Sequence, residues 1–156
     1  GSHDAATVQA YLKAVIGFFK SLETPPVVCD LGCGDFNVGK ELVPYTQAYK
    51  AVDIVPELIA HNKELFKSKK LSFDTIDLAK DPLPEGDCSL LRQVLQPLSN
   101  AEIASIVNKL YAYRYVILTE HLPDQEFTPN IDIISGQGIR LKKKEWRRVT
   151  DTSFYF

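Results

Sequence analysis

A carboxylate and two glycines occupy the point where an apolar strand is expected to give way to a helix. Asp30 stands near the end of the apolar run 27–31, and Gly32 and Gly34 follow it at intervals of two. A turn with so few side chains lets backbone N–H groups approach a ligand at the carboxyl end of the strand. Asp30 and Asp35 favour a ligand with a positively charged end, because carboxylates repel phosphates.

Two phosphate-binding motifs fit this turn less well. A P-loop requires Gly-x-x-x-x-Gly-Lys followed by Ser or Thr, and the chain has this glycine and lysine spacing from Gly34 to Lys40. Residue 41 is Glu, however, so the magnesium-binding hydroxyl is missing. A dinucleotide fold requires Gly-x-Gly-x-x-Gly, and Asn37 stands in place of the third glycine. An NAD-binding Rossmann protein therefore remains the less favoured alternative.

The turn resembles the first motif of the class I S-adenosylmethionine-dependent methyltransferases, an acid-x-Gly-x-Gly-x-Gly between strand and helix. Asp30, Gly32 and Gly34 match this motif, and Phe36 replaces its third glycine. We expect the Phe36 ring either beside the methionine-like part of the ligand or folded back as packing. The resemblance implies that the amino acid end of S-adenosylmethionine lies against Asp30, Gly32, Cys33, Gly34, Asp35 and Asn37.

A second acid, Asp53, ends the second expected strand. An acid at this place accepts hydrogen bonds from both ribose hydroxyls of an adenosine ligand, as it does in dinucleotide sites. The family resemblance implies that Ile54 lies against the adenine. It also implies that Asp77 and the backbone N–H of Leu78, after the third strand, lie near the adenine amino group.

The stretch after the fourth strand resembles the part of the family where the cofactor meets the acceptor, so Gln93 and Val94 are assigned to the cofactor. Three side chains at strand ends are candidates for catalysis. Arg92 faces the pocket by its position, Glu120 would position an amine, and His121 would take a proton from the acceptor. Because the donor methyl is already activated, alignment is the main demand and the catalytic residue stays unassigned.

The expected activity is methyl transfer from S-adenosylmethionine to a small-molecule acceptor, with S-adenosylhomocysteine as product. A nucleic acid acceptor is disfavoured by the formal net charge of −2 and by the lack of an Asp/Asn-Pro-Pro-aromatic run after the fourth strand. The basic run 142–148 keeps it possible through phosphate contacts. A second class of function also remains open, a cofactor-binding domain that is non-catalytic or needs a partner subunit. The sequence predicts no oligomeric state.

Alternating strands and helices predict an α/β, Rossmann-like methyltransferase sheet with helices on both faces. We expect about seven strands, mostly parallel, with an antiparallel ribbon at the C-terminal end. The expected helices span 5–22, 38–47, 56–69 and 100–112, the last with a capping box from Ser99 to Glu102. The expected strands span 27–31, 50–54, 71–77, 88–93 and 113–121, followed by ribbon strands at 131–134, 138–141, 146–149 and 154–156.

The length of 156 residues suits one domain, which we place at 4–156 after a tag remnant at 1–3. The three cysteines include no Cys-x-x-Cys pair, so we expect reduced thiols in a cytoplasmic protein and no metal site. No apolar run reaches the roughly 18 residues of a membrane span, and nothing resembles a signal peptide. We therefore expect no membrane partner.

Overall fold

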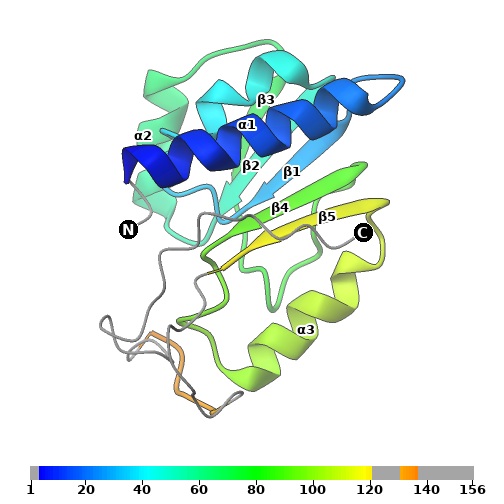
Figure 1. Ribbon diagram of the computed structural model, residues 1–156. Coiled ribbons are helices and arrows are strands. Elements are labelled where there is room, and N and C mark those ends of the chain that lie inside the picture. Colours follow the sequence, from blue (N-terminus) through cyan, green and yellow to red (C-terminus); the bar gives the residue numbers. More distant parts are fainter. Residues whose placement is uncertain (1–3, 121–130, 137–156) are drawn as a thin grey trace.

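Strand β1 (Val27–Leu31) lies at the centre of a five-stranded sheet with the order β3-β2-β1-β4-β5 (Figure 1). The computed structural model describes residues 4–120 and 131–136. All four strand pairs are parallel, so the α/β prediction is confirmed. From β1 the chain adds β2 and β3 on one side and then β4 and β5 on the other. Sheets of this kind bind ligands in the crevice at this switch point, which lies between β1 and β4. The other strands are β2 (Ala48–Asp53), β3 (Leu71–Thr75), β4 (Cys88–Arg92) and β5 (Tyr115–Thr119).

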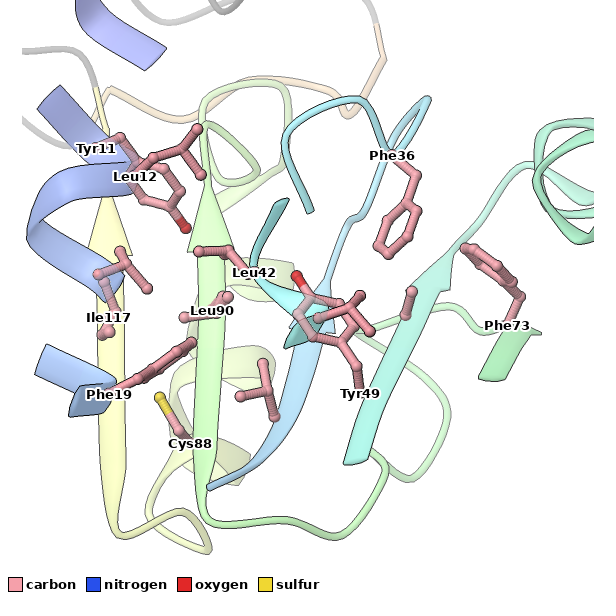
Figure 2. Packing of buried hydrophobic residues seen from close by; sticks show 14 of the residues in the cluster. Tyr11, Leu12, Phe19, Phe36, Leu42, Tyr49, Phe73, Cys88, Leu90 and Ile117 are labelled. Carbon is pink, nitrogen blue, oxygen red and sulfur yellow. The ribbon is translucent and has the colours of Figure 1, made fainter. Parts of the chain in front are cut away.

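Helices cover both faces of the sheet. Helix α1 (Ala5–Ser21) and helix α2 (Pro56–Leu65) belong to one core, and helix α3 (Asn100–Leu110) belongs to the other. Figure 1 shows α1 and α3 on opposite sides of the strands. In Figure 2 the α1 side chain Phe19 packs toward Cys88 of β4. A strand buried on both faces needs apolar residues at successive positions, which explains why every β1 residue except Asp30 is apolar.

The expected helix over 38–47 is wrong. The structure forms two short 3₁₀ helices instead, Gly39–Glu41 and Val43–Tyr45. Pro44 has no backbone N–H and its ring clashes with the carbonyl four residues earlier, so it prevents a regular α-helix through this segment.

Other boundaries differ by a few residues. Helix α2 ends at Leu65, four residues before the expected end, and Phe66 is already extended. The capping box of α3 is confirmed, since the N–H of Glu102 donates to Ser99 Oγ (3.3 Å) and the N–H of Ser99 donates to a Glu102 carboxylate oxygen (3.1 Å). Strand β5 begins at Tyr115, because the N–H of Tyr113 still donates to the carbonyl of Leu110 at the end of α3 (3.1 Å).

The expected ribbon strand at 131–134 is not formed. Residues 131–136 lie without strand structure against the start of α3, where the N–H of Asn100 donates to Asp132 (2.8 Å) and the N–H of Ser99 donates to Ser135 (2.7 Å). The other three ribbon strands lie outside the described residues, so they stay a prediction. Among the helices of residues 4–120, none has the length and apolar character needed to cross a bilayer.

Candidate cofactor site

A cavity of about 510 Å³ opens at the carboxyl ends of the central strands. Its volume falls within the usual range for small-molecule sites, roughly 300–1,000 Å³. The predicted cofactor residues line this cavity with the exception of Asn37, which is exposed. The predicted residues in the lining are Asp30, Gly32, Cys33, Gly34, Asp35, Asp53, Ile54, Asp77, Leu78, Gln93 and Val94.

The glycine turn needs both of its glycines. Gly32 has φ +91° and Gly34 has φ +56°, a left-handed conformation that favours glycine. A Cβ on Gly32 would come within 2.7 Å of the Val94 side chain, so the turn also passes close to the segment after β4. The N–H groups of Gly32 and Cys33 both donate to the carbonyl of Val52 (2.9 Å each), which fastens the turn to the end of β2.

Asp53 connects the turn to the start of α2. The N–H of Gly34 donates to Asp53 Oδ2 (3.0 Å), and the N–H of Val55 donates to Oδ1 (3.1 Å). A carboxylate offers about four acceptor positions, so roughly two remain for further donors. Asp53 therefore stands fixed at the cavity wall with acceptor capacity to spare. The Ile54 side chain next to it is 60% exposed, an apolar surface at the cavity mouth.

Asn62 is a structural contact of the turn that the sequence analysis missed. This α2 residue is 0% exposed, and its Nδ2 donates to the carbonyl of Gly34 (2.8 Å). It lies three residues after Ile59 and four before Phe66, both of which pack in the core. A polar residue on the buried face of an apolar pattern could therefore have predicted this contact from the sequence.

Asp30 is a nearly buried acid in the cavity wall, with 9% of its surface exposed. Burial raises the pKa of Asp30 to about 6. The hydroxyl of Tyr49, which donates to Asp30 Oδ2 (2.7 Å), works against this rise, Asp53 adds to it, and Arg92 opposes it. The carboxyl therefore titrates close to neutrality.

Arg92 adds a positive charge to the cavity wall near Asp30. Its guanidinium lies over the ring of Tyr11 from α1, 5.3 Å from the ring centroid. Burial lowers the pKa of Arg92, while Tyr11, Asp30 and Asp35 act in the opposite direction. Tyr11 also lines the cavity, a role that the sequence analysis did not predict. Asp30 and Arg92 therefore bring opposite charges to the wall of the same cavity.

Phe36 is folded back as packing, which decides between the two expectations for this residue. Its side chain is 1% exposed and does not line the cavity. Figure 2 shows the ring between those of Tyr49 and Phe73, and Phe66 completes an edge-to-face cluster with centroid distances of 5.5, 4.9 and 5.3 Å. The residue adopts φ +65°, so the backbone keeps the conformation of a glycine while the side chain fills the core.

The candidates for catalysis are placed very differently. Arg92 lines the cavity, whereas Glu120 does not. One Glu120 oxygen accepts the N–H groups of Val94 (3.0 Å) and Leu95 (2.8 Å), so this side chain holds the segment after β4 in place. Burial raises the pKa of Glu120, and these two hydrogen bonds oppose the rise. His121 lies outside the described residues.

The segment after β4 begins with Gln93, a cavity-lining residue whose backbone is left-handed. Gln93 has φ +57°, and its N–H donates to the carbonyl of Thr119 (2.7 Å). Asp77 also lines the cavity, and its Oδ1 accepts the N–H of Ala79 (3.0 Å) in a local turn. In residues 4–120 and 131–136, no cluster of three or more His, Cys, Asp or Glu side chains is arranged to hold a metal ion.

Solved structures with this arrangement are methyltransferases and a related enzyme. The methyltransferase domain of bacterial CtHen1 has a TM-score of 0.63 and 21% identity over 77% of this chain and 68% of that one. Human N-acetylserotonin methyltransferase in complex with SAM gives 0.53 and 23%, over 72% and 37%. The [4+2]-cyclase SpnF gives 0.62 and 14%, over 81% and 52%. These likenesses define the Rossmann-like methyltransferase fold, and the cyclase among them means that activity must be argued from the site.

The sequence comparisons identify the family. Residues 3–125 match the O-methyltransferase domain, and the chain therefore belongs to this family of class I S-adenosylmethionine-dependent methyltransferases. Acetylserotonin O-methyltransferase of Homo sapiens is 30% identical over 90 residues, which cover 55% of this chain and 26% of that protein. The Macaca mulatta protein of the same name is 29% identical over the same shares. The chain thus spans about a quarter of the length of these curated relatives.

Proposed function

We propose that this chain binds S-adenosylmethionine and transfers its methyl group to a small-molecule acceptor, leaving S-adenosylhomocysteine. The observation that carries the proposal is the order of charges along the cavity. The three charged side chains follow the strand order, with Asp53 at the end of β2, Asp30 in β1 and Arg92 at the end of β4. Asp30 therefore stands between the other two, and both affect its pKa. This order suits a ligand with a hydroxyl pair at one point and an amino acid group, with one positive and one negative charge, at the other.

Asp53 and its neighbours would hold the adenosine part of the cofactor. The acceptor positions left on Asp53 suit the two ribose hydroxyls, and the exposed Ile54 side chain suits the face of the adenine. Leu78, Val94 and Ile106 give the facing wall an apolar character. An aromatic base with polar edges binds favourably between such surfaces.

Asp30 and Arg92 would hold the amino acid part. The Asp30 carboxylate suits the ammonium group, and the Arg92 guanidinium suits the carboxylate. When bound, the cofactor supplies an activated methyl group, so alignment of the acceptor is the main task left to the protein. Arg92 is therefore proposed as a binding residue, and Glu120 as a residue that positions the segment after β4.

The acceptor is proposed to be a small molecule without a large negative charge. Acids outnumber cations in the described cavity wall, which disfavours phosphates and hence nucleic acids. The charged residues of the wall are Asp30, Asp35, Asp53, Asp77, Glu102 and Arg92.

The protein is also proposed to be cytoplasmic. Cys29, Cys33 and Cys88 are unpaired thiols, which supports a cytoplasmic location.

Calorimetric titration of the protein with S-adenosylmethionine, S-adenosylhomocysteine and NAD tests the proposal. We expect binding of the first two ligands and none of NAD. Tight NAD binding without a response to either adenosyl ligand would overturn it. A screen of small-molecule acceptors for S-adenosylhomocysteine release then separates an enzyme from a cofactor-binding domain, since the latter binds cofactor but releases no product with any acceptor.

Exchange of Arg92 for glutamine is expected to weaken S-adenosylhomocysteine binding about tenfold, as a charge-assisted hydrogen bond contributes roughly 1.5–3 kcal/mol. Adenosine, which lacks the carboxylate, should bind both proteins equally. The matched control is Arg114→Gln, because Arg114 stacks on Tyr115 at the same 5.3 Å but does not line the cavity. An equal loss of affinity for adenosine would contradict the assignment of Arg92 to the carboxylate.

Binding of S-adenosylhomocysteine should weaken on acidification. With its pKa at about 6, Asp30 is mostly ionised at neutral pH and mostly protonated one unit below that pKa. If the ammonium group binds the ionised form, affinity falls about tenfold between about pH 7 and about pH 5. Calorimetry across this range measures the change. In Asp30→Asn the affinity should be lower and constant, and a wild-type affinity that does not change with pH would count against this contact.

A further inference from the structure

We infer that Asn62, a fully buried side chain of α2, is a positioning residue that fixes Gly34 and, through Gly34, the ribose-binding acid Asp53. The inference rests on the proposed function for its consequence in binding. Asn62 does not line the cavity, so it would touch no ligand atom. Its effect would pass through the backbone of the glycine turn.

Gly34 is held from both sides. Its N–H donates to Asp53 Oδ2 (3.0 Å), and its carbonyl accepts from Asn62 Nδ2 (2.8 Å). These two contacts come from different elements, the end of β2 and the second turn of α2. Gly34 itself has φ +56°, a conformation reached at little cost by glycine and therefore easily lost without outside contacts. The Gly34 carbonyl also receives a long contact from the Cys33 thiol (3.8 Å), and the Asn62 amide is the shorter of the two contacts that orient it.

An amide at this place is costly for folding. Asn62 is 0% exposed on a face that also carries Ile59, and its Oδ1 is buried with no hydrogen-bond partner. A buried polar atom left unpaired costs about 1–3 kcal/mol, and an apolar side chain would avoid that cost. The hydrogen bond from Asn62 to Gly34, which orders a ligand-binding turn, offsets this cost.

The amide also acts on the neighbouring turn residue Cys33. Burial raises the pKa of the Cys33 thiol, and a contact with Asn62 works in the opposite direction. Cys33 lines the cavity and is half-buried, whereas Cys29 and Cys88 are fully buried in β1 and β4. The three thiols therefore report separately on the turn and on the core.

Asn62→Leu keeps the approximate size of the side chain and removes the donor. We expect S-adenosylhomocysteine to bind about tenfold more weakly, because the Gly34 carbonyl loses its amide partner and the Gly34 N–H then holds Asp53 less firmly. The matched control is Ile59→Val, a change on the same buried face of α2 that should leave affinity unaltered. Loss of affinity in the control equal to that in Asn62→Leu would mean that any damage to α2 has this effect.

A double-mutant cycle with Asp53→Ala tests the route of the effect. If Asn62 acts through Asp53, Asn62→Leu should weaken binding by about twofold or less once Asp53 is alanine, against about tenfold in the wild-type background. Nuclear magnetic resonance titration with S-adenosylhomocysteine measures these weak affinities. Full additivity of the two substitutions would overturn the coupling.

Alkylation of the ligand-free protein by iodoacetamide, followed by peptide mass spectrometry, gives a readout that does not depend on the cofactor. Burial is the largest cause of the raised Cys33 pKa and the Asn62 contact the smallest, so hydration of the thiol in a loosened turn should outweigh the loss of that contact. Asn62→Leu should therefore speed the modification of Cys33 several-fold and leave Cys29 and Cys88 unchanged. An unchanged Cys33 rate, or equal acceleration of all three thiols, would overturn the claim that Asn62 fixes the turn. If wild-type protein binds no adenosyl ligand, the proposed function fails, and the Cys33 rates still decide whether Asn62 fixes the turn.

Discussion

Exchange of Asp53 for alanine is expected to weaken the binding of S-adenosylhomocysteine about 100-fold. The wild-type carboxylate is fixed by the N–H groups of Gly34 and Val55 and keeps acceptor positions for both ribose hydroxyls. Two hydrogen bonds to a charged acceptor contribute roughly 1.5–3 kcal/mol each, and part of this is regained when water solvates the emptied site. The dissociation constant from calorimetry measures the effect.

Asp74→Ala is the matched control for this experiment. Asp74 is an exposed acid on the neighbouring strand β3 and does not line the cavity, so its removal changes the net charge equally without touching the site. We expect it to bind the ligand as the wild type does. Full affinity in Asp53→Ala, or an equal loss in Asp74→Ala, would remove Asp53 from the ribose site.

Phe36→Gly restores the third glycine of the family motif and is nevertheless expected to destabilise the protein. Removal of a buried phenylalanine side chain costs about 3–5 kcal/mol. Relief of the left-handed conformation at φ +65° returns only about 1–2 kcal/mol. The cost of the cavity therefore exceeds the gain in backbone conformation, and the free energy of unfolding should fall by about 1–4 kcal/mol, the difference of these ranges. Urea unfolding followed by circular dichroism measures it.

Comparison with Phe36→Ala separates the two contributions. Alanine leaves almost the same cavity but retains a Cβ at positive φ, so Phe36→Ala should be the less stable variant by about 1 kcal/mol. Phe36→Leu, which keeps most of the buried volume, should lose least. A Phe36→Gly protein more stable than the wild type would mean that the aromatic cluster contributes little.

Features set by nearby residues were predictable from the sequence. The apolar runs predicted the strands, the Ser99 to Glu102 spacing predicted the start of α3, and the acid–glycine turn predicted where the cavity lies. These features depend on side-chain periodicity and on backbone conformations that few residues adopt. The wrong helix over 38–47 also had a local cause, Pro44, to which the pattern of apolar residues gave too little weight.

Features set by contacts between distant residues were not predictable. Tyr11 reaches the site only because α1 packs across β4 and places its ring beside Arg92. The packing of Phe36 depends on Phe66 and Phe73, which come from two later elements. Glu120 accepts a hydrogen bond from the backbone after β4 because β5 is the neighbour of β4 in the sheet, and this strand order could not be predicted from local sequence.

The central place of β1 has a consequence for the synthesis of the chain. Its partner β2 follows soon after it, whereas β4 is made only after β3 and a long loop. Until residues 88–92 leave the ribosome, one edge of β1 has unpaired backbone groups beside apolar side chains such as Val28 and Leu31, and such edges pair with other chains. The nascent β1–β3 half already carries Asp30, the glycine turn and Asp53. Arrival of β4 therefore closes an aggregation-prone edge and, in the same step, adds Arg92 to complete the charged end of the cavity.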